Sequence, residues 1–201
     1  DVSPSLRLSA DLVDQRFVKE LRQQEGQRTW HFAHGMLREA LLRHALKLGR
    51  LEQHHAHAVN MLRVSNASAS RIGKHLLSAG QLNAALGPLE RAVMGAIQTG
   101  DHRAAQSALI DWSDALRLLN FPDNRRDWLK IGLANAQLLR IQGELTEADR
   151  KTLEIIEKAK RRPHLRLVAE CYQLRATVLV ELARYQEALI FLNKLDDIEK
   201  R

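Results

Sequence analysis

The sequence has little of what β-rich, disulfide-bonded or membrane-spanning proteins need. Aromatic residues make up 4% of its 201 residues, with four prolines and ten glycines, which argues against sandwiches and barrels. The single cysteine, Cys171, excludes an internal disulfide, and its place on a helical apolar stripe predicts a small core residue. No apolar run approaches the roughly twenty residues of a membrane span. We therefore expect no membrane contact and a cytoplasmic location, and the missing initial methionine suggests a segment of a longer protein.

Motifs that bind phosphates or activate a nucleophile are also missing. The sequence has no Gly-x-x-x-x-Gly-Lys-Ser/Thr loop, no kinase catalytic loop and no Gly-x-Ser-x-Gly elbow. We therefore predict a segment that is not an enzyme and binds no cofactor. A parent protein could still carry an ATPase or kinase domain elsewhere.

Histidines are the only candidates for metal ligands. His31 and His34 lie close in sequence, and His54, His55 and His57 form a second group. A zinc site would need three or four of them to converge, and neither group has a well-spaced cysteine or carboxylate. We predict no metal site, with His34 at a helix start and His55 half-buried.

Apolar residues recur at spacings of three and four from residue 34 onward, which is typical of amphipathic helices. Before them, the polar stretch 23–28 resembles the tip of a small β-hairpin. Asp101 is a plausible N-cap, and so is Thr146, with Asp149 in a capping-box position. Pro88 predicts a kink or a shortened first turn in its helix. We therefore predict an all-α chain with helices over 69–79, 82–98, 102–119, 124–141, 146–161, 165–182 and 185–199.

A turn pattern recurs in the second half: a small residue, a large apolar residue two positions later and an alanine five positions later. The small residue allows a tight reversal, and the alanine allows two helices to approach closely. The copies are Gly80-Gln81-Leu82 with Ala85, Gly143-Glu144-Leu145 with Ala148, Ala183-Arg184-Tyr185 with Ala188 and, more weakly, Gly100 with Ala105.

This pattern resembles the tetratricopeptide repeat over roughly 69–198, and Trp128, Ile131 and Gly132 resemble that family's opening helix. The copies are separated by 40 and 63 residues, so the repeats are long and irregular. The resemblance implies antiparallel helical hairpins stacked as a degenerate solenoid over 67–201.

A second resemblance lies in Phe32-Ala33-His34-Gly35-Met36-Leu37-Arg38-Glu39, followed by Gly49 and the histidine group. It is similar to the junction that follows the winged helix in bacterial STAND-class signalling ATPases, especially those fused to a serine/threonine protein kinase domain. This resemblance implies a partial winged-helix-like segment over 1–33 and a linking helical hairpin over 34–66.

The chain is basic, with a formal net charge of +7, which raises the question of nucleic-acid binding. Its basic run at 158–162 ends a predicted helix, where the macrodipole favours cations, and no aromatic residues are interleaved for base stacking. We therefore predict no nucleic-acid binding by this segment.

Tetratricopeptide arrays bind partners on a concave surface lined by the first helix of each pair. Carried over by distance from each turn, these positions are Ser70, Lys74, Leu77, Gln137, Arg140, Glu170, Gln173, Thr177 and Val180. The predicted partner contacts are the polar residues Lys74, Gln137, Arg140, Gln173 and Thr177.

The leading hypothesis is a sensor or docking arm that binds a protein or peptide in a larger bacterial signal-transduction ATPase or serine/threonine kinase. Two alternatives stay open. One is an effector-binding regulatory segment of a transcription factor, and the other is a structural module that self-associates.

Overall fold

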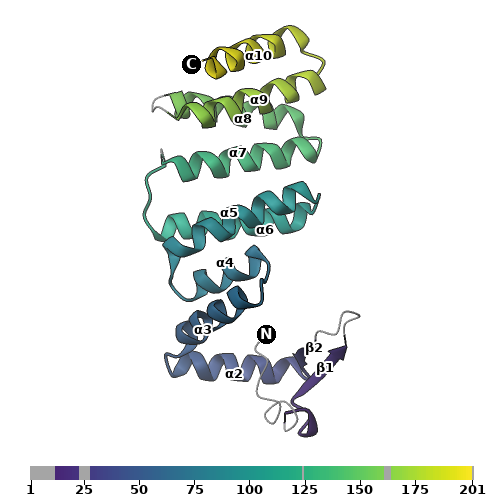
Figure 1. The fold of residues 1–201 in the computed structure, drawn as a ribbon, viewed down its shortest axis with the longest axis vertical. Helices are drawn as coiled ribbons and strands as arrows, with labels where there is room; N and C mark the ends of the chain where they lie inside the picture. The colour runs from purple at the N-terminus through teal and green to yellow at the C-terminus, as the bar shows by residue number, and fades with distance from the viewer. Residues whose placement is uncertain (1–11, 23–27, 124, 161–163, 201) are drawn as a thin grey trace. The chain divides into compact units, whose positions relative to one another are not determined.

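The computed structural model describes residues 12–22, 28–123, 125–160 and 164–200, and most of them are helical (Figure 1). The expected all-α class is confirmed at this level. The chain divides into two compact units, residues 1–84 and 85–201. The predicted boundaries after residues 33 and 66 both fall inside the first unit and stay predictions. No helix of the described residues is long and apolar enough to cross a membrane.

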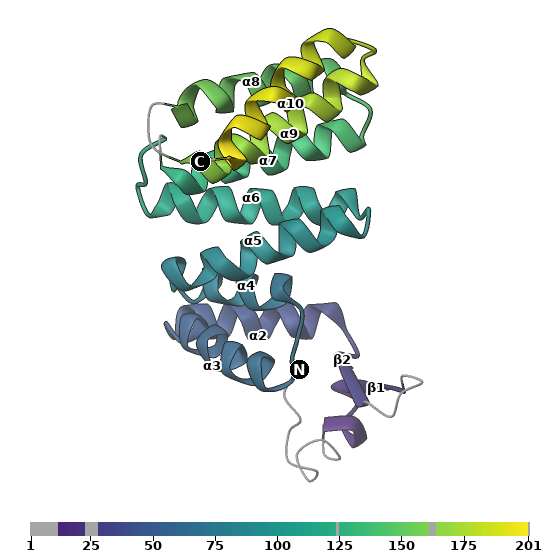
Figure 2. The same ribbon diagram turned by 45° about the horizontal axis from the view of Figure 1, so that its top comes forward.

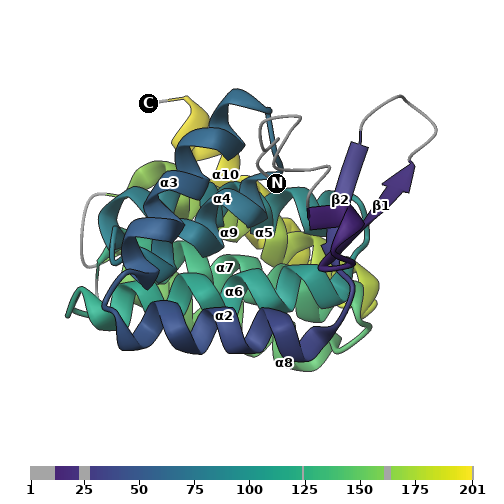
Figure 3. The ribbon, with the colours of Figure 1, turned by 90° about the horizontal axis from the view of Figure 1, so that it is seen from below.

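The first unit contains an antiparallel hairpin, confirming the expected β element. Strands β1 (Val18–Arg22) and β2 (Arg28–Phe32) pair with Val18 opposite Phe32. Of the predicted tip at 23–28, Arg28 belongs to β2 and residues 23–27 lie outside the described residues. Helices α2 (Gly35–Lys47), α3 (Leu51–Val64) and α4 (Ala69–Ser78) follow. Helix α2 contacts β2 and α3, and α3 packs against α4 (Figure 3).

The second unit consists of helices that end close to their predicted limits. They are α5 (Leu82–Gln98, which starts in the first unit), α6 (His102–Leu118), α7 (Arg126–Ile141), α8 (Leu145–Lys160), α9 (Leu165–Glu181) and α10 (Tyr185–Glu199). From α6 to α10, each helix packs against the next, and α7 also contacts α9 (Figure 2). Helix α5 continues through Pro88, so the proline does not end it.

The small turn residues adopt the left-handed conformation that their spacing predicts. The φ angles are 84° at Gly143 and 59° at Ala183. At the end of α9, the Ala183 N–H donates to the Val180 carbonyl (2.9 Å) and the Arg184 N–H donates to the Leu179 carbonyl (2.8 Å). These two bonds form a Schellman motif, which satisfies carbonyls that the helix end would leave unpaired. The recurring pattern is therefore a helix stop signal.

The alanines of the pattern lie where helices meet. Ala105 and Ala148 are fully buried, and Ala188 is 2% exposed. Trp112 on α6 is 1% exposed, as expected of a core anchor. A Cβ added to Gly132 of α7 would lie 3.1 Å from the side chain of Ile155 on α8. Small residues therefore set the close spacing of these helices.

Two capping predictions had different outcomes. Asp101 caps α6, since its carboxylate accepts a hydrogen bond from the Ala104 N–H at 2.9 Å. The Thr146 cap was wrong, because α8 already begins at Leu145. Asp149 binds Arg175 and Arg184 instead of closing a capping box.

Candidate partner-binding groove

Helices α5, α7 and α9 line a groove in the second unit. It consists of two adjoining hollows with volumes of about 350 Å³ and 340 Å³, which share Met94, Leu133, Gln137 and Glu170. The contact between α7 and α9 brings two stretches of chain that are separated by a whole helix onto the same surface. Its lining combines polar and apolar side chains.

Four of the five residues predicted to contact a partner line this groove. Gln137 and Arg140 are three apart on α7, and Gln173 and Thr177 are four apart on α9, so each pair shares one helix face. All four line the same hollow. Lys74 is an exposed residue of α4, in the first unit, and is not among the lining residues.

Ion pairs join the helices along the groove. The Lys130 ammonium of α7 lies 2.5 Å from a carboxylate oxygen of Glu90 on α5. A guanidinium nitrogen of Arg140 lies 2.6 Å from Glu181 on α9. Because these pairs are half-exposed, they contribute little to stability, but they fix the orientation of the side chains that a partner would meet.

Sequence reasoning missed four charged residues that line the groove. They are Glu90 on α5, Arg126 and Lys130 on α7, and Arg166 on α9. In the tetratricopeptide register α5 is the second helix of its pair and therefore was not expected to line the surface. The signal that could have found Glu90 and Lys130 is their opposite charge, but 40 residues separate them.

Two buried N–H groups of lining residues have no hydrogen-bond acceptor among the described residues. They are the Trp112 indole Nε1, on a side chain that is almost fully buried, and the Arg140 Nε. A buried donor without an acceptor costs about 1–3 kcal/mol.

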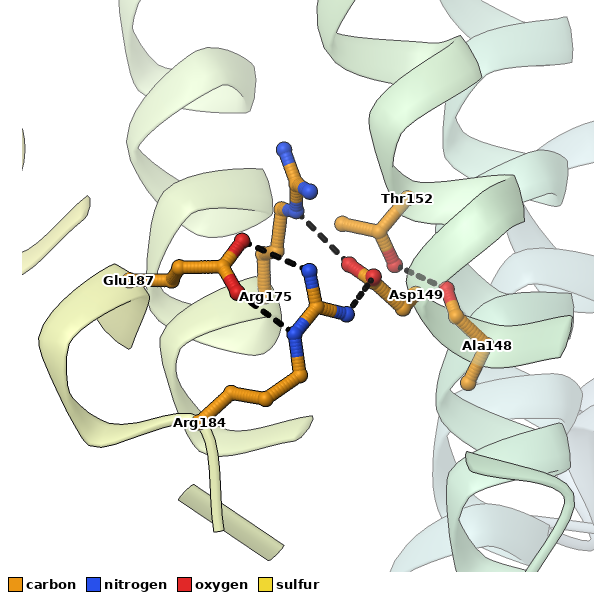
Figure 4. Close-up of polar contacts among 6 residues, drawn as sticks. All are labelled: Ala148, Asp149, Thr152, Arg175, Arg184 and Glu187. Carbon is orange, nitrogen blue, oxygen red and sulfur yellow. Dashed lines mark hydrogen bonds and ion pairs between the residues drawn. The ribbon is translucent and has the colours of Figure 1, made fainter. Parts of the chain in front are cut away.

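A second polar cluster joins α8, α9 and α10, outside the residues that line the groove (Figure 4). Asp149 accepts hydrogen bonds from Arg175 Nε (2.7 Å) and from an Arg184 guanidinium nitrogen (2.9 Å), while Arg184 also binds Glu187. The Arg175 guanidinium lies 4.4 Å from the ring centre of Phe191. The side chains of Asp149 and Arg175 are only 13% and 9% exposed, so this cluster holds helices together.

Neither the cysteine nor the histidines form a reactive centre in the described part of the chain. Burial raises the pKa of the Cys171 thiol to about 12, so it stays protonated and unreactive, as expected of a core residue. His34 occupies the N-cap position of α2 without a side-chain cap bond, and His55 is half-buried. No group of three or more His, Cys, Asp or Glu side chains among the described residues is placed to hold a metal ion.

Comparison of the chain with protein-family models, with curated proteins and with solved structures finds no match.

Proposed function

We propose that residues 85–201 are a degenerate tetratricopeptide-like array that binds a protein or peptide segment in the groove on α5, α7 and α9. On this proposal the segment is a non-catalytic docking or sensor arm of a larger bacterial signalling ATPase or serine/threonine kinase. The observation that supports it best is that Gln137, Arg140, Gln173 and Thr177, chosen from the repeat register alone, line one hollow.

The chemistry of the groove suits an extended or helical polypeptide. The side-chain amides of Gln137 and Gln173 can both donate and accept hydrogen bonds, as a polypeptide backbone requires. Apolar side chains such as Met94 provide surface to bury. This mixture of donors, amides and apolar surface, without a nucleophile or metal ligand set, favours recognition over catalysis.

The groove can be tested without a known partner by selecting a displayed library of random peptides against the full chain. Affinities of the selected peptides are then measured for the unchanged chain, for Gln137→Ala and for Asn135→Ala. Asn135 is the matched control: it is an equally half-buried amide on α7, but it lines a different hollow, between α6 and α7.

We expect Gln137→Ala to weaken the selected peptides about tenfold, which corresponds to about 1.4 kcal/mol. Asn135→Ala should leave binding unchanged, and circular dichroism should show that all variants keep their helices. Equal weakening by both amide variants, or a library that yields no binding peptide, would refute the groove assignment.

A further inference from the structure

The first unit contains a separate hollow of about 540 Å³ between α2, α3 and α4. Its size lies within the range of about 300–1,000 Å³ that is typical of small-molecule sites. Six of its lining residues are apolar: Phe32, Leu41, Leu42, Ala45, Leu48 and Leu51. In Figure 3, α3 and α4 are drawn above α2.

Helix α2 provides most of the apolar wall, and none of its residues is buried. Leu41 is 48% exposed, Leu42 38% and Leu48 49%. Exposed large apolar residues are unremarkable when scattered, but here they converge on one hollow. A ligand with an apolar body would therefore bury surface that is otherwise in contact with water.

The polar part of the hollow is entirely basic. The remaining lining residues are Arg38, His44, Arg50, His54, His55 and His75. The acidic residues Glu39 and Glu52 belong to α2 and α3 but are not among the lining residues. A hollow with two guanidinium groups and no carboxylate attracts an anion.

A histidine pair closes one side of the hollow. The Nδ1 atoms of His55 on α3 and His75 on α4 lie 2.9 Å apart, so one ring donates a hydrogen bond and the other accepts it. Partial burial, with His54 nearby, lowers the pKa of His55. Partial burial, with His55 and Arg71 nearby, lowers the pKa of His75. Both rings are therefore neutral near pH 7, which leaves Arg38 and Arg50 as the permanent positive charges of the lining.

We propose that this hollow binds a small amphipathic anion, with an aliphatic body against Leu41, Leu42 and Leu48 and a carboxylate held by Arg38 and Arg50. The size of the hollow favours a small molecule over a protein helix, and the one-sided charge favours a carboxylate over an alcohol or an amine. The site is independent of the groove on α5, α7 and α9, because it lies in the other unit and shares no residue with it.

The test is isothermal titration calorimetry of the full chain with three probes that share a ten-carbon tail: decanoate, decanol and decyltrimethylammonium. The two ions are kept below their micelle concentrations, and decanol is kept below its solubility limit. Decanoate should bind most tightly, and the cation should bind least. The variant pair Arg38→Ala and Arg50→Ala should weaken decanoate at least about tenfold, to the level of decanol.

The matched control is Arg43→Ala with Arg63→Ala, which removes the same charge from exposed positions of α2 and α3 that do not line the hollow. We expect it to leave decanoate affinity unchanged. If the control variant weakens decanoate binding equally, the effect is one of overall charge and the proposed site is refuted. Decyltrimethylammonium binding as tightly as decanoate would also refute it.

A further result would assign the surface to another occupant. If sedimentation shows a dimer that Leu41→Asp dissociates, and decanoate does not bind, the apolar face of α2 meets a second copy of the chain and the small-molecule proposal is wrong.

Discussion

Replacing Asp149 should destabilise the second unit far more than removing an exposed acidic residue. Its carboxylate accepts hydrogen bonds from Arg175 on α9 and from Arg184 at the start of α10, so it joins three helices. In Asp149→Ala the Arg175 guanidinium, 9% exposed, would lose its counterion. Arg184 would keep Glu187 and is less affected.

The expected loss follows from this burial. Removing one partner of a buried ion pair costs about 3–5 kcal/mol, because the remaining charge stays out of water without a partner. The Arg175 guanidinium keeps its contact with the Phe191 ring, which places the estimate at the low end, about 3 kcal/mol. For a unit of this size, that corresponds to a decrease of roughly 10 °C in Tm.

The measurement is urea unfolding followed by tryptophan fluorescence, since urea is uncharged and does not screen ion pairs. A Trp30→Phe background leaves Trp112 and Trp128, both in the second unit, as reporters. The control is Asp196→Ala. The Asp196 side chain, which pairs with Lys200, is 59% exposed, so its removal should lower the free energy of unfolding by under about 0.5 kcal/mol.

A double variant tests the cause of the loss. In Asp149→Ala with Arg175→Met, the buried charge is gone, so we expect the double variant to be more stable than Asp149→Ala alone by about 1 kcal/mol or more. The reasoning is refuted if Asp149→Ala costs no more than Asp196→Ala, or if the two substitutions in the double variant simply add.

Two further predictions concern the turn before α10 and the histidine pair. Ala183→Gly should stabilise the second unit by about 1 kcal/mol in the same urea assay, because glycine adopts φ 59° without the strain of a Cβ, whereas Ala188→Gly, inside α10, should destabilise it. Because the pKa values of His55 and His75 are lowered from 6.5, their stabilisation is complete above pH 6.5 and is lost as the pH falls through their native values. Amide-exchange protection in α3 and α4, measured relative to α9, should therefore fall between pH 7.5 and 5.5. In the double variant His55→Asn with His75→Asn, this pH-dependent fall should be smaller. Constant protection in the unchanged chain would contradict the role given to the histidine pair.

The helices and turns could be predicted because their causes are local. A helix depends on hydrogen bonds between residues four apart and on an apolar stripe of the same period, both visible in sequence. A left-handed residue such as Gly143 ends a helix through bonds within the preceding turn. That is why the predicted ends of α4 to α10 lie within two residues of the observed ones.

The groove could be predicted only in part. The repeat register selected Gln137, Arg140, Gln173 and Thr177, since residues three or four apart on one helix share a face. Glu90 was missed because its place beside Lys130 depends on how α5 packs, which no local pattern specifies. The capping box at Thr146 failed because α8 begins one residue earlier, at Leu145, and the arginines that Asp149 binds lie 26 and 35 residues away in sequence.

By itself, the sequence determined an all-α chain, its helix limits, its turn residues and its lack of catalytic motifs. Only the tertiary structure decided which side chains meet across helices: the lining of the groove, the Asp149 cluster, and the basic hollow where His55 meets His75, twenty residues away in sequence. The physical reason is that a helix forms from bonds to its own neighbours, whereas a site forms from packing between elements whose order along the chain does not fix their distance.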